Sequence, residues 1–323
     1  MTGLKNILPI VLMSLTFIIF STTRSFSENY QCDVNGDNLL GLAEAVNFLR
    51  DVSGMLSDGP LAVLECGEPT FEITGSGVLS TEAKRYILCR MNQIRSQTAL
   101  GIIEDDGTSN YYPIAANMQR MQWDEDLATV ANDHAAQCIY EHNPDRNTEY
   151  AVLTGIVNPA VGENIAASGI SWTIGSTEAV DAIKTAFAGW NGESTLWHYD
   201  TINDDSWVAG IGHFTQNIWA NTTRVGCGQA WCPDGWPDGG YNMIFTVCNY
   251  YTAGNYWNNY PYQSGDEVCS ADLHPGDRCE NGLVSPEDYI TGLVYECDVN
   301  GDGLLGLEEV INVLRVLSGA SAQ

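Results

Sequence analysis

The segment from Gly212 to Trp219, which continues to Gly228, limits the possible folds of this chain more than any other stretch. Its apolar residues follow neither the spacing of an amphipathic helix nor the alternation of a strand. The segment therefore predicts a polar turn centred on His213, held between glycines and followed by aromatic residues. A second dense motif, Gly162–Ile165, lies about fifty residues upstream. Two linked motifs of this kind are hard to obtain by chance, so we expect the functional site in the middle of the chain.

The chain is strongly acidic. Among its 323 residues, 41 Asp and Glu stand against 13 Lys and Arg, which gives a formal net charge of -28. This excess argues against nucleic acid and anionic membrane surfaces as partners. It suits calcium binding, a secreted protein, or both, although most of these carboxylates are expected only to keep the surface soluble.

Residues 1–27 have the pattern of a signal peptide. Lys5 supplies the positive start, Ile7–Phe20 the apolar stretch, and Ser25–Ser27 a small-x-small cleavage site. The apolar stretch is short for a membrane span, and no later segment approaches about 20 apolar residues. We therefore expect a mature protein without a transmembrane segment, secreted to the extracellular space, or to the periplasm if the source is bacterial. A retained signal anchor is the alternative. Ten cysteines agree with export to an oxidising compartment.

Residues 32–54 are repeated at 297–319 with about two thirds identity. Each copy fits an EF-hand-type calcium loop, in which several oxygen ligands lie on a tightly curled loop before a helix. The predicted calcium ligands, at loop positions 1, 3, 5 and 12, are Asp33, Asn35, Asp37 and Glu44 in the first copy and Asp298, Asn300, Asp302 and Glu309 in the second. The first copy has Asn38 where the second has Gly303, so we expect its loop to bind calcium less tightly. A turn rich in Asp and Asn that holds no metal is the alternative.

Each loop leads into a helical pattern, and the loops resemble the calcium repeats of dockerins, except that position 12 is Glu rather than Asp. An isolated EF-hand leaves its apolar helix face without a partner. We therefore expect the two copies to pair with each other and to close the chain around its central domain. The rival partner for the C-terminal copy is the segment 283–294.

The central region predicts helices flanking an antiparallel sheet. Ser80 is expected to begin a helix, a second helix is expected from Leu127 to about Ile139, and a third from Ser176 to Trp190. Thr223–Ala230 and Tyr241–Tyr250 are typical of strands. This order of elements indicates an α+β layered domain.

The central region resembles the CAP superfamily, which comprises cysteine-rich secretory proteins, antigen-5-like venom allergens and pathogenesis-related-1 proteins. The resemblance rests on Gly162–Ile165, Gly212–Gly228, Met121–Asp124 and Asn249–Tyr256. It implies an α+β fold of the CAP type, an α-β-α sandwich, here with small helical EF-hand-like elements at both ends. The expected divisions are a signal peptide (1–27), a calcium loop and helix (28–67), a CAP domain (76–263), a hinge-like linker with cysteines (264–282) and a C-terminal EF-hand-like segment (283–319).

The resemblance also implies a cavity that brings together His142, at a helix end, with Glu163, Glu193 and His213. Two imidazoles from distant segments are expected to bind Zn²⁺ or another divalent cation, and the carboxylates to orient them or to take a proton from bound water. Hydrogen-bonded structural histidines are the alternative, because a third protein ligand is not evident. Thr215 and Gln216 are expected to line the cavity.

The resemblance further implies the disulfides Cys138–Cys227 and Cys232–Cys248, with Cys269–Cys279 from the family's hinge. Cys32–Cys66 is expected because it closes a modest loop, although a sequence cannot fix connectivity.

These features favour a secreted binding protein with a cation-binding His/Glu cavity, calcium-binding ends and a lipid, a sterol or an extracellular protein as its ligand. Two alternatives stay open. One is a metal-dependent peptidase with Glu163 or Glu193 as catalytic base. The other is an assembly element that recruits a partner through its calcium loops.

Overall fold

The computed structural model describes residues 63–64, 66–67, 73, 79–105, 110–271, 274–275 and 277–286, which belong to one compact unit spanning residues 55–294. The expected signal peptide, both calcium loops with their pairing, and the segment 287–294 lie outside the described residues. In the part of the chain that is described, no helix is long and apolar enough to cross a membrane.

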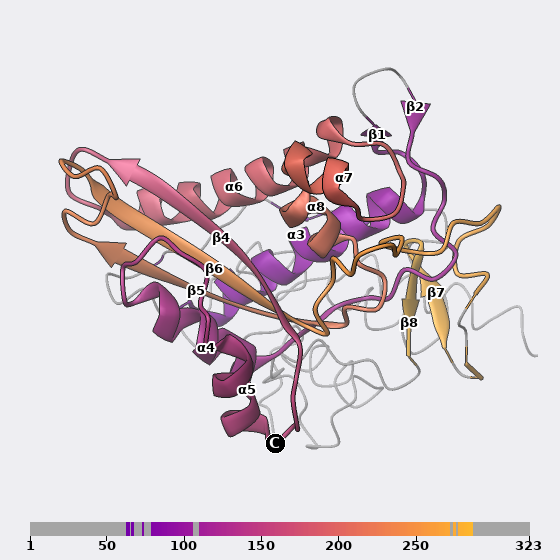
Figure 1. Ribbon diagram of the computed structural model, residues 1–323, viewed down its shortest axis with the longest axis horizontal. Helices are drawn as coiled ribbons and strands as arrows, with labels where there is room; N and C mark the ends of the chain where they lie inside the picture. Colours follow the sequence, from indigo (N-terminus) through magenta and orange to yellow (C-terminus); the bar gives the residue numbers. More distant parts are fainter. Residues whose placement is uncertain are drawn as a thin grey trace, which may run out of the picture. The chain divides into compact units, whose positions relative to one another are not determined.

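A four-stranded sheet forms the centre of the domain (Figure 1). Its strand order is β3-β5-β6-β4, with bounds Gln122–Trp123, Arg224–Cys232, Asn242–Tyr251 and Val161–Ile170. Strands β4, β6 and β5 pair antiparallel, and the short β3 runs parallel to β5. Strand β6 is buried along almost its whole length, which explains its nearly continuous run of apolar residues. Strand β4 is an edge strand, so one of its sides is free of strand pairing.

Helices cover both faces of the sheet (Figure 1). Their bounds are α3 Thr81–Ala99, α4 Glu125–Ala135, α5 Arg146–Thr154, α6 Ser176–Gly192, α7 Asp204–Ala209 and α8 Gly212–Asn217, with a 3₁₀ turn η1 at Glu193–Leu196. Cys248 and Tyr250 of β6 pack with α3 and α6, whereas Met243, Phe245 and Val247 pack with α4. This alternation follows from the period of two along a strand. The predicted α-β-α sandwich is confirmed for the described part of the chain.

The expected helices and strands of the central region are present, with shifted ends. Ser80 caps α3 as predicted, because its Oγ accepts a hydrogen bond from the Ala83 amide. Helix α4 begins two residues earlier than expected, since Asp124 accepts from the amides of Asp126 and Leu127. It ends at Ala135, so the prediction that His142 ends a helix is wrong. His142 lies instead in the connection between α4 and α5.

The segment around His213 corrects a second expectation, because Gly212–Asn217 forms the short helix α8 rather than a non-helical turn. A signal for its start is missing from the segment itself. Glu193, twenty residues upstream, accepts hydrogen bonds from the amides of His213 and Phe214 through Oε2, both at 2.9 Å. The helix begins where a distant carboxylate satisfies its first amides.

Gly226 and Gly228 allow α4 to lie directly on strand β5. A Cβ at Gly226 would overlap the backbone of Asp124 and Ala128, and one at Gly228 would overlap Asn132. The helix therefore runs along the strand with almost no space between the two backbones. This close approach gives a physical reason for the two glycines that flank Cys227.

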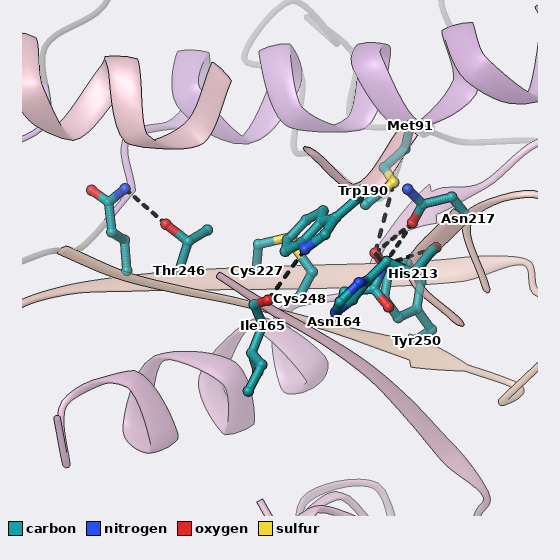
Figure 2. Close-up of a disulfide and its surroundings, with 11 residues drawn as sticks. Met91, Asn164, Ile165, Trp190, His213, Asn217, Cys227, Thr246, Cys248 and Tyr250 are labelled. Atoms are coloured by element: carbon teal, nitrogen blue, oxygen red, sulfur yellow. Dashed lines mark hydrogen bonds between the residues drawn. A yellow bond between two sulfur atoms is a disulfide. The ribbon is translucent and has the colours of Figure 1, made fainter. Parts of the chain in front are cut away.

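Three of the four expected disulfides are wrong, and for two of them the path of α4 explains why. The structure joins Cys138 to Cys232 and Cys227 to Cys248, where the pairs 138–227 and 232–248 were expected. Cys227 lies directly opposite Cys248 on the neighbouring strand (Figure 2). Because α4 passes Gly226 and Gly228 in order, the chain beyond its end reaches the last residue of β5, Cys232.

Cys66 bonds to Cys89 of α3, not to Cys32, whereas the expected Cys269–Cys279 bond is confirmed.

Two small hairpins complete the described part: β1 Glu104–Asp105 with β2 Asn110–Tyr111, and β7 Arg278–Glu280 with β8 Leu283–Ser285. The second hairpin packs on the central domain. Leu283 is fully buried, the Ser96 hydroxyl donates to the Asn281 carbonyl at 2.6 Å, and the Val284 amide donates to the Met118 carbonyl at 2.8 Å. The end of the segment expected to be a linker is thus bound to α3 and its neighbours.

Candidate functional site

His142 and Glu163 form the first of two histidine–glutamate pairs. The Nδ1 atom of His142 lies 2.8 Å from Glu163 Oε1, which also accepts the Asn143 amide at 2.9 Å. Glu163 Oε2 accepts from the side-chain amide of Asn249 at 3.1 Å. The Glu163 side chain is fully buried, whereas that of His142 is 57% exposed. Both carboxylate oxygens are thus engaged by neighbouring groups, and no described residue hydrogen-bonds the other imidazole nitrogen, Nε2.

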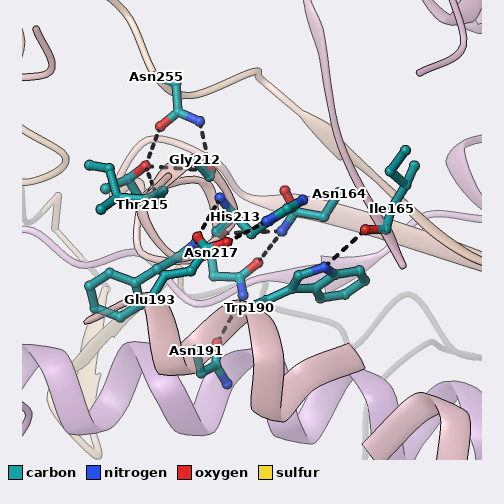
Figure 3. Close-up of polar contacts among 12 residues, drawn as sticks. Asn164, Ile165, Trp190, Asn191, Glu193, Gly212, His213, Thr215, Asn217 and Asn255 are labelled. Atoms are coloured by element: carbon teal, nitrogen blue, oxygen red, sulfur yellow. Dashed lines mark hydrogen bonds and ion pairs between the residues drawn. The ribbon is translucent and has the colours of Figure 1, made fainter. Parts of the chain in front are cut away.

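His213 and Glu193 form the second pair (Figure 3). Glu193 Oε1 lies 2.5 Å from His213 Nδ1, while Oε2 accepts the two amides at the start of α8. The Trp190 ring stacks on the imidazole with centroids 5.9 Å apart. Glu193 therefore fixes the His213 ring and its backbone together. The side chain of His213 is 32% exposed, again with Nδ1 engaged and Nε2 left over.

A network of buried polar side chains supports α8 (Figure 3). The Asn164 side chain donates to the His213 carbonyl at 3.2 Å and to Asn217 Oδ1 at 2.9 Å. The Tyr250 hydroxyl donates to the same Asn217 oxygen at 2.9 Å, and burial raises the pKa of Tyr250 well above its usual value. The hydroxyl consequently keeps its proton at physiological pH. Asn217 in turn donates to Asn191 Oδ1 at 2.9 Å.

Consecutive residues of edge strand β4 connect the two pairs. Glu163 binds His142, and the next residue, Asn164, binds the His213 carbonyl. Neighbouring side chains of a strand point to opposite faces of a sheet. Glu163 and Asn164 therefore contact the two pairs from opposite faces of β4. Gly162 precedes Glu163 in β4, and a Cβ there would overlap the Gln216 side chain of α8.

The structure separates the four expected metal ligands into two kinds. The histidines keep a free nitrogen, whereas both glutamates are occupied by imidazole and by N–H groups. Among the described residues, no group of three or more His, Cys, Asp or Glu is arranged to hold a metal ion. A hydrogen-bonded carboxylate behind a metal-bound imidazole is a common second-layer arrangement.

Thr215 and Gln216 have structural partners rather than open positions. Thr215 is fully buried and its hydroxyl lies 2.6 Å from Asn255 Oδ1. Gln216, also buried, accepts the Gly254 amide at 2.8 Å. Both side chains attach α8 to the loop after β6. They therefore hold this helix in place, whereas they were expected to line a cavity.

A shallow hollow of about 320 Å³ lies between the turn that follows α8 and the loop after β6. It is lined by aromatic and amide side chains and by neighbouring apolar atoms, from Asn117, Trp219, Ala220, Asn221, Asn259, Tyr260, Pro261, Tyr262 and Gln263. None of these residues is charged. The hollow is separate from the two histidine–glutamate pairs, and lipid or sterol binding stays a prediction.

The residues that hold the site together were not predicted from the sequence. Asn143 and Asn249 bind Glu163, while Asn191, Asn217 and Tyr250 support α8. Asn217 belongs to the segment around His213, and Asn249 belongs to the motif 249–256. Both residues therefore lie in segments that the sequence motifs single out. Their partners depend on tertiary contacts that no local pattern contains.

Comparison with known proteins places these features in a family. The model of the cysteine-rich secretory protein (CAP) family matches residues 88–250, about half of the chain. Venom allergen 3 of Solenopsis invicta is 34% identical over 191 residues, covering 58% of this chain and 75% of that protein. Peptidase inhibitor 16 of Bos taurus is 31% identical over 235 residues, covering 71% of this chain but only 42% of that protein.

Solved structures show the same fold. The crystal structure of Na-ASP-1 matches with a TM-score of 0.54 and 26% identity, over 68% of this chain and 52% of that one. The structure of NaASP2 with Zn²⁺ matches with a TM-score of 0.50 and 26% identity, over 68% of this chain and all of that one.

Proposed function

Because the chain belongs to the cysteine-rich secretory protein family, we propose that it is an exported binding protein whose two histidine–glutamate pairs hold one divalent cation. Export is supported by the signal-peptide pattern of residues 1–27 and by disulfides among the described residues. The relatives named as venom allergens fit an extracellular protein.

The observation that carries the proposal is that both glutamates are fully engaged. Each carboxylate fixes one imidazole through Nδ1 and accepts further N–H groups with its remaining lone pairs. This engagement orients Nε2 of His142 and of His213 as the available donors. Imidazole nitrogens suit Zn²⁺, and two such donors would leave coordination positions for water or a ligand. The Zn²⁺ named for the NaASP2 structure is that protein's ion, and here it supports the choice of probe.

The same engagement disfavours the hydrolase alternative. A catalytic base must be free to take a proton from water or substrate within hydrogen-bond reach. Glu163 is fully buried and saturated by His142, Asn143 and Asn249. Glu193 has little more freedom, because its second oxygen caps α8. We therefore assign both glutamates to positioning the histidines.

Zinc titration by calorimetry tests this proposal. The full chain is expected to bind one Zn²⁺, and His142→Ala and His213→Ala are each expected to abolish the same binding event. His274→Ala is the matched control, since His274 also lies beside a carboxylate, Asp277, at 3.3 Å but has no second pair. Two independent ions, or unchanged binding in either of the first two variants, would contradict a shared site.

A paired test addresses the glutamates. Glu193→Gln keeps the size of the side chain but removes an acceptor, and it is expected to weaken zinc binding about 10- to 100-fold. Glu178→Gln, at a carboxylate that accepts the Gly175 amide at the start of α6, should leave zinc binding unchanged. Cleavage of a peptide library by the wild type, lost in Glu163→Gln, would instead favour the peptidase.

We further propose that the repeats 32–54 and 297–319 bind calcium. The support is the recurrence of the full ligand pattern, from Asp33 to Glu44 and from Asp298 to Glu309. Recruitment of a scaffold partner through these loops, as in dockerins, is the assembly form of this proposal. Calcium-dependent pull-down that depends on Glu309 would separate assembly from simple stabilisation.

A further inference from the structure

An exposed aromatic surface lies next to α8, formed by Trp207 of α7 and by Tyr256, Trp257 and Tyr260 of the loop after β6. We call these four residues the aromatic face. About half of each side chain is exposed, with 55% for Trp207 and 50% for Trp257. Large aromatic side chains gathered at a surface are uncommon without a binding role, and Trp and Tyr are the residues most often found at the centre of interfaces.

The aromatic face is held in place by contacts with α8 and with neighbouring rings. The Asn255 side chain donates to the Gly212 carbonyl and accepts from Thr215, which fixes the loop against α8 (Figure 3). The ring of Trp207 lies against Gly212, and the Trp207 and Trp257 centroids are 6.2 Å apart. Tyr260 stacks on Tyr199 at 5.0 Å. The rings are therefore presented on a fixed frame and need little ordering when a partner binds.

The stretch of chain that contributes this surface is acidic. Between residues 185 and 277 the chain has a single basic residue, Arg224, against ten Asp and Glu. Asp204 and Asp205 are exposed on α7, the helix of Trp207. Asp204 is one helical turn from Trp207, so its carboxylate lies on the side of α7 that carries the indole. The neighbouring hollow adds neutral acceptors from Asn221, Asn259 and Gln263.

Aromatic rings beside carboxylates and amide oxygens suit a cationic partner that can both stack on the rings and donate hydrogen bonds. A guanidinium group stacks on Trp and Tyr rings and donates in its plane to carboxylates and amides, while an ammonium group does so less well. A net charge of -28 draws a basic partner toward the molecule as a whole. We propose that the aromatic face docks an arginine-containing basic segment of another protein. This surface does not involve the two histidine–glutamate pairs.

Fluorescence anisotropy with two labelled peptides of equal charge, an arginine nonamer and a lysine nonamer, tests the proposal on the full chain in 150 mM salt. The arginine peptide is expected to bind several-fold more tightly than the lysine peptide. The double variant Trp207→Ala with Trp257→Ala should weaken arginine-peptide binding about tenfold or more. Chelation of divalent cations should not change the preference for the arginine peptide over the lysine peptide.

The matched control is Trp172→Ala with Tyr241→Ala, two aromatic residues of similar exposure outside the aromatic face. Equal affinity losses in the two double variants, or none in either, would overturn the proposal by showing that the peptide responds only to the acidic surface. Binding of chitohexaose in place of the arginine peptide would overturn it in favour of a glycan. If the tryptophan variant fails to fold, Asp204→Asn with Asp205→Asn, both exposed, must weaken the arginine peptide several-fold for the proposal to stand.

Discussion

Arg95 shows how single residues fix the position of the site from a distance. Its side chain is fully buried in α3, where its five guanidinium N–H groups donate to the carbonyl oxygens of Gln119, Asn217, Trp219, Ala220 and Thr222. Four of those carbonyls belong to the end of α8 and the turn that follows it. Burial lowers the pKa of Arg95 to about 9, so the group is still charged at neutral pH. A buried cation among carbonyls thus holds the far end of the helix that Glu193 begins.

Arg95→Leu is expected to lower the free energy of unfolding by about 3–5 kcal/mol, because it leaves several buried carbonyls without donors. Urea unfolding with the disulfides intact, followed by tryptophan fluorescence, measures the change. Arg95→Lys should recover only part of the loss, since an ammonium cannot reach all five oxygens. Arg90→Leu, five residues earlier in α3 and bonded to Gln93, should cost under about 1 kcal/mol. Similar losses for Arg90 and Arg95 would refute this account of the buried guanidinium.

At the scale of elements, the contact between α4 and β5 decides more of the architecture than either element alone. It depends on Gly226 and Gly228, it directs the chain beyond α4 toward Cys232, and it leaves Cys227 to bond with Cys248 across the sheet. Because α4 also contributes the connection that carries His142, a shift of this helix would move one of the two histidines.

Gly226→Ala is expected to destabilise the fold by about 3 kcal/mol, the upper part of the usual range for overpacking, because the new Cβ meets helix backbone that cannot move aside. Gly189→Ala is its counterpart on the exposed side of α6, where a Cβ meets nothing within 4 Å. That substitution should stabilise the protein by up to about 1 kcal/mol, since alanine is the better helix former. Thermal and urea unfolding of both variants provide the measurement. If Gly226→Ala were neutral, the close approach of α4 would have no energetic role.

These elements also show which parts of the structure the sequence could predict. Local signals predicted α3, α6 and two central strands within a few residues, because caps and hydrophobic periodicity act within one element. Helix α8 was missed since its cap, Glu193, is twenty residues away. The disulfide partners were missed because they follow from the path of α4 over the sheet. Glu163 and Glu193 were predicted as site residues, but their role depends on which N–H groups reach them.

For the whole molecule, the excess of negative charge and the repeated ends suggest one prediction. Calcium at millimolar concentration is expected to raise the melting temperature of the full chain by several degrees relative to a chelator. Ions that bind only folded loops contribute about 2.7 kcal/mol when present at a hundred times the dissociation constant. Scanning calorimetry in the two conditions measures the shift.

Two comparisons separate calcium coordination from simple screening of the -28 charge. Magnesium at the same concentration screens the charge equally but fits a flexible loop with a bidentate carboxylate poorly, so it should raise the melting temperature less. Glu309→Gln and Glu44→Gln each remove such a carboxylate. The first should reduce the calcium effect more, because the second loop, which has Gly303 at its sixth position, is expected to bind calcium more tightly, and the double variant should lose the effect. An equal rise with magnesium, or a rise that survives in the double variant, would mean that the repeats add charge but hold no ion.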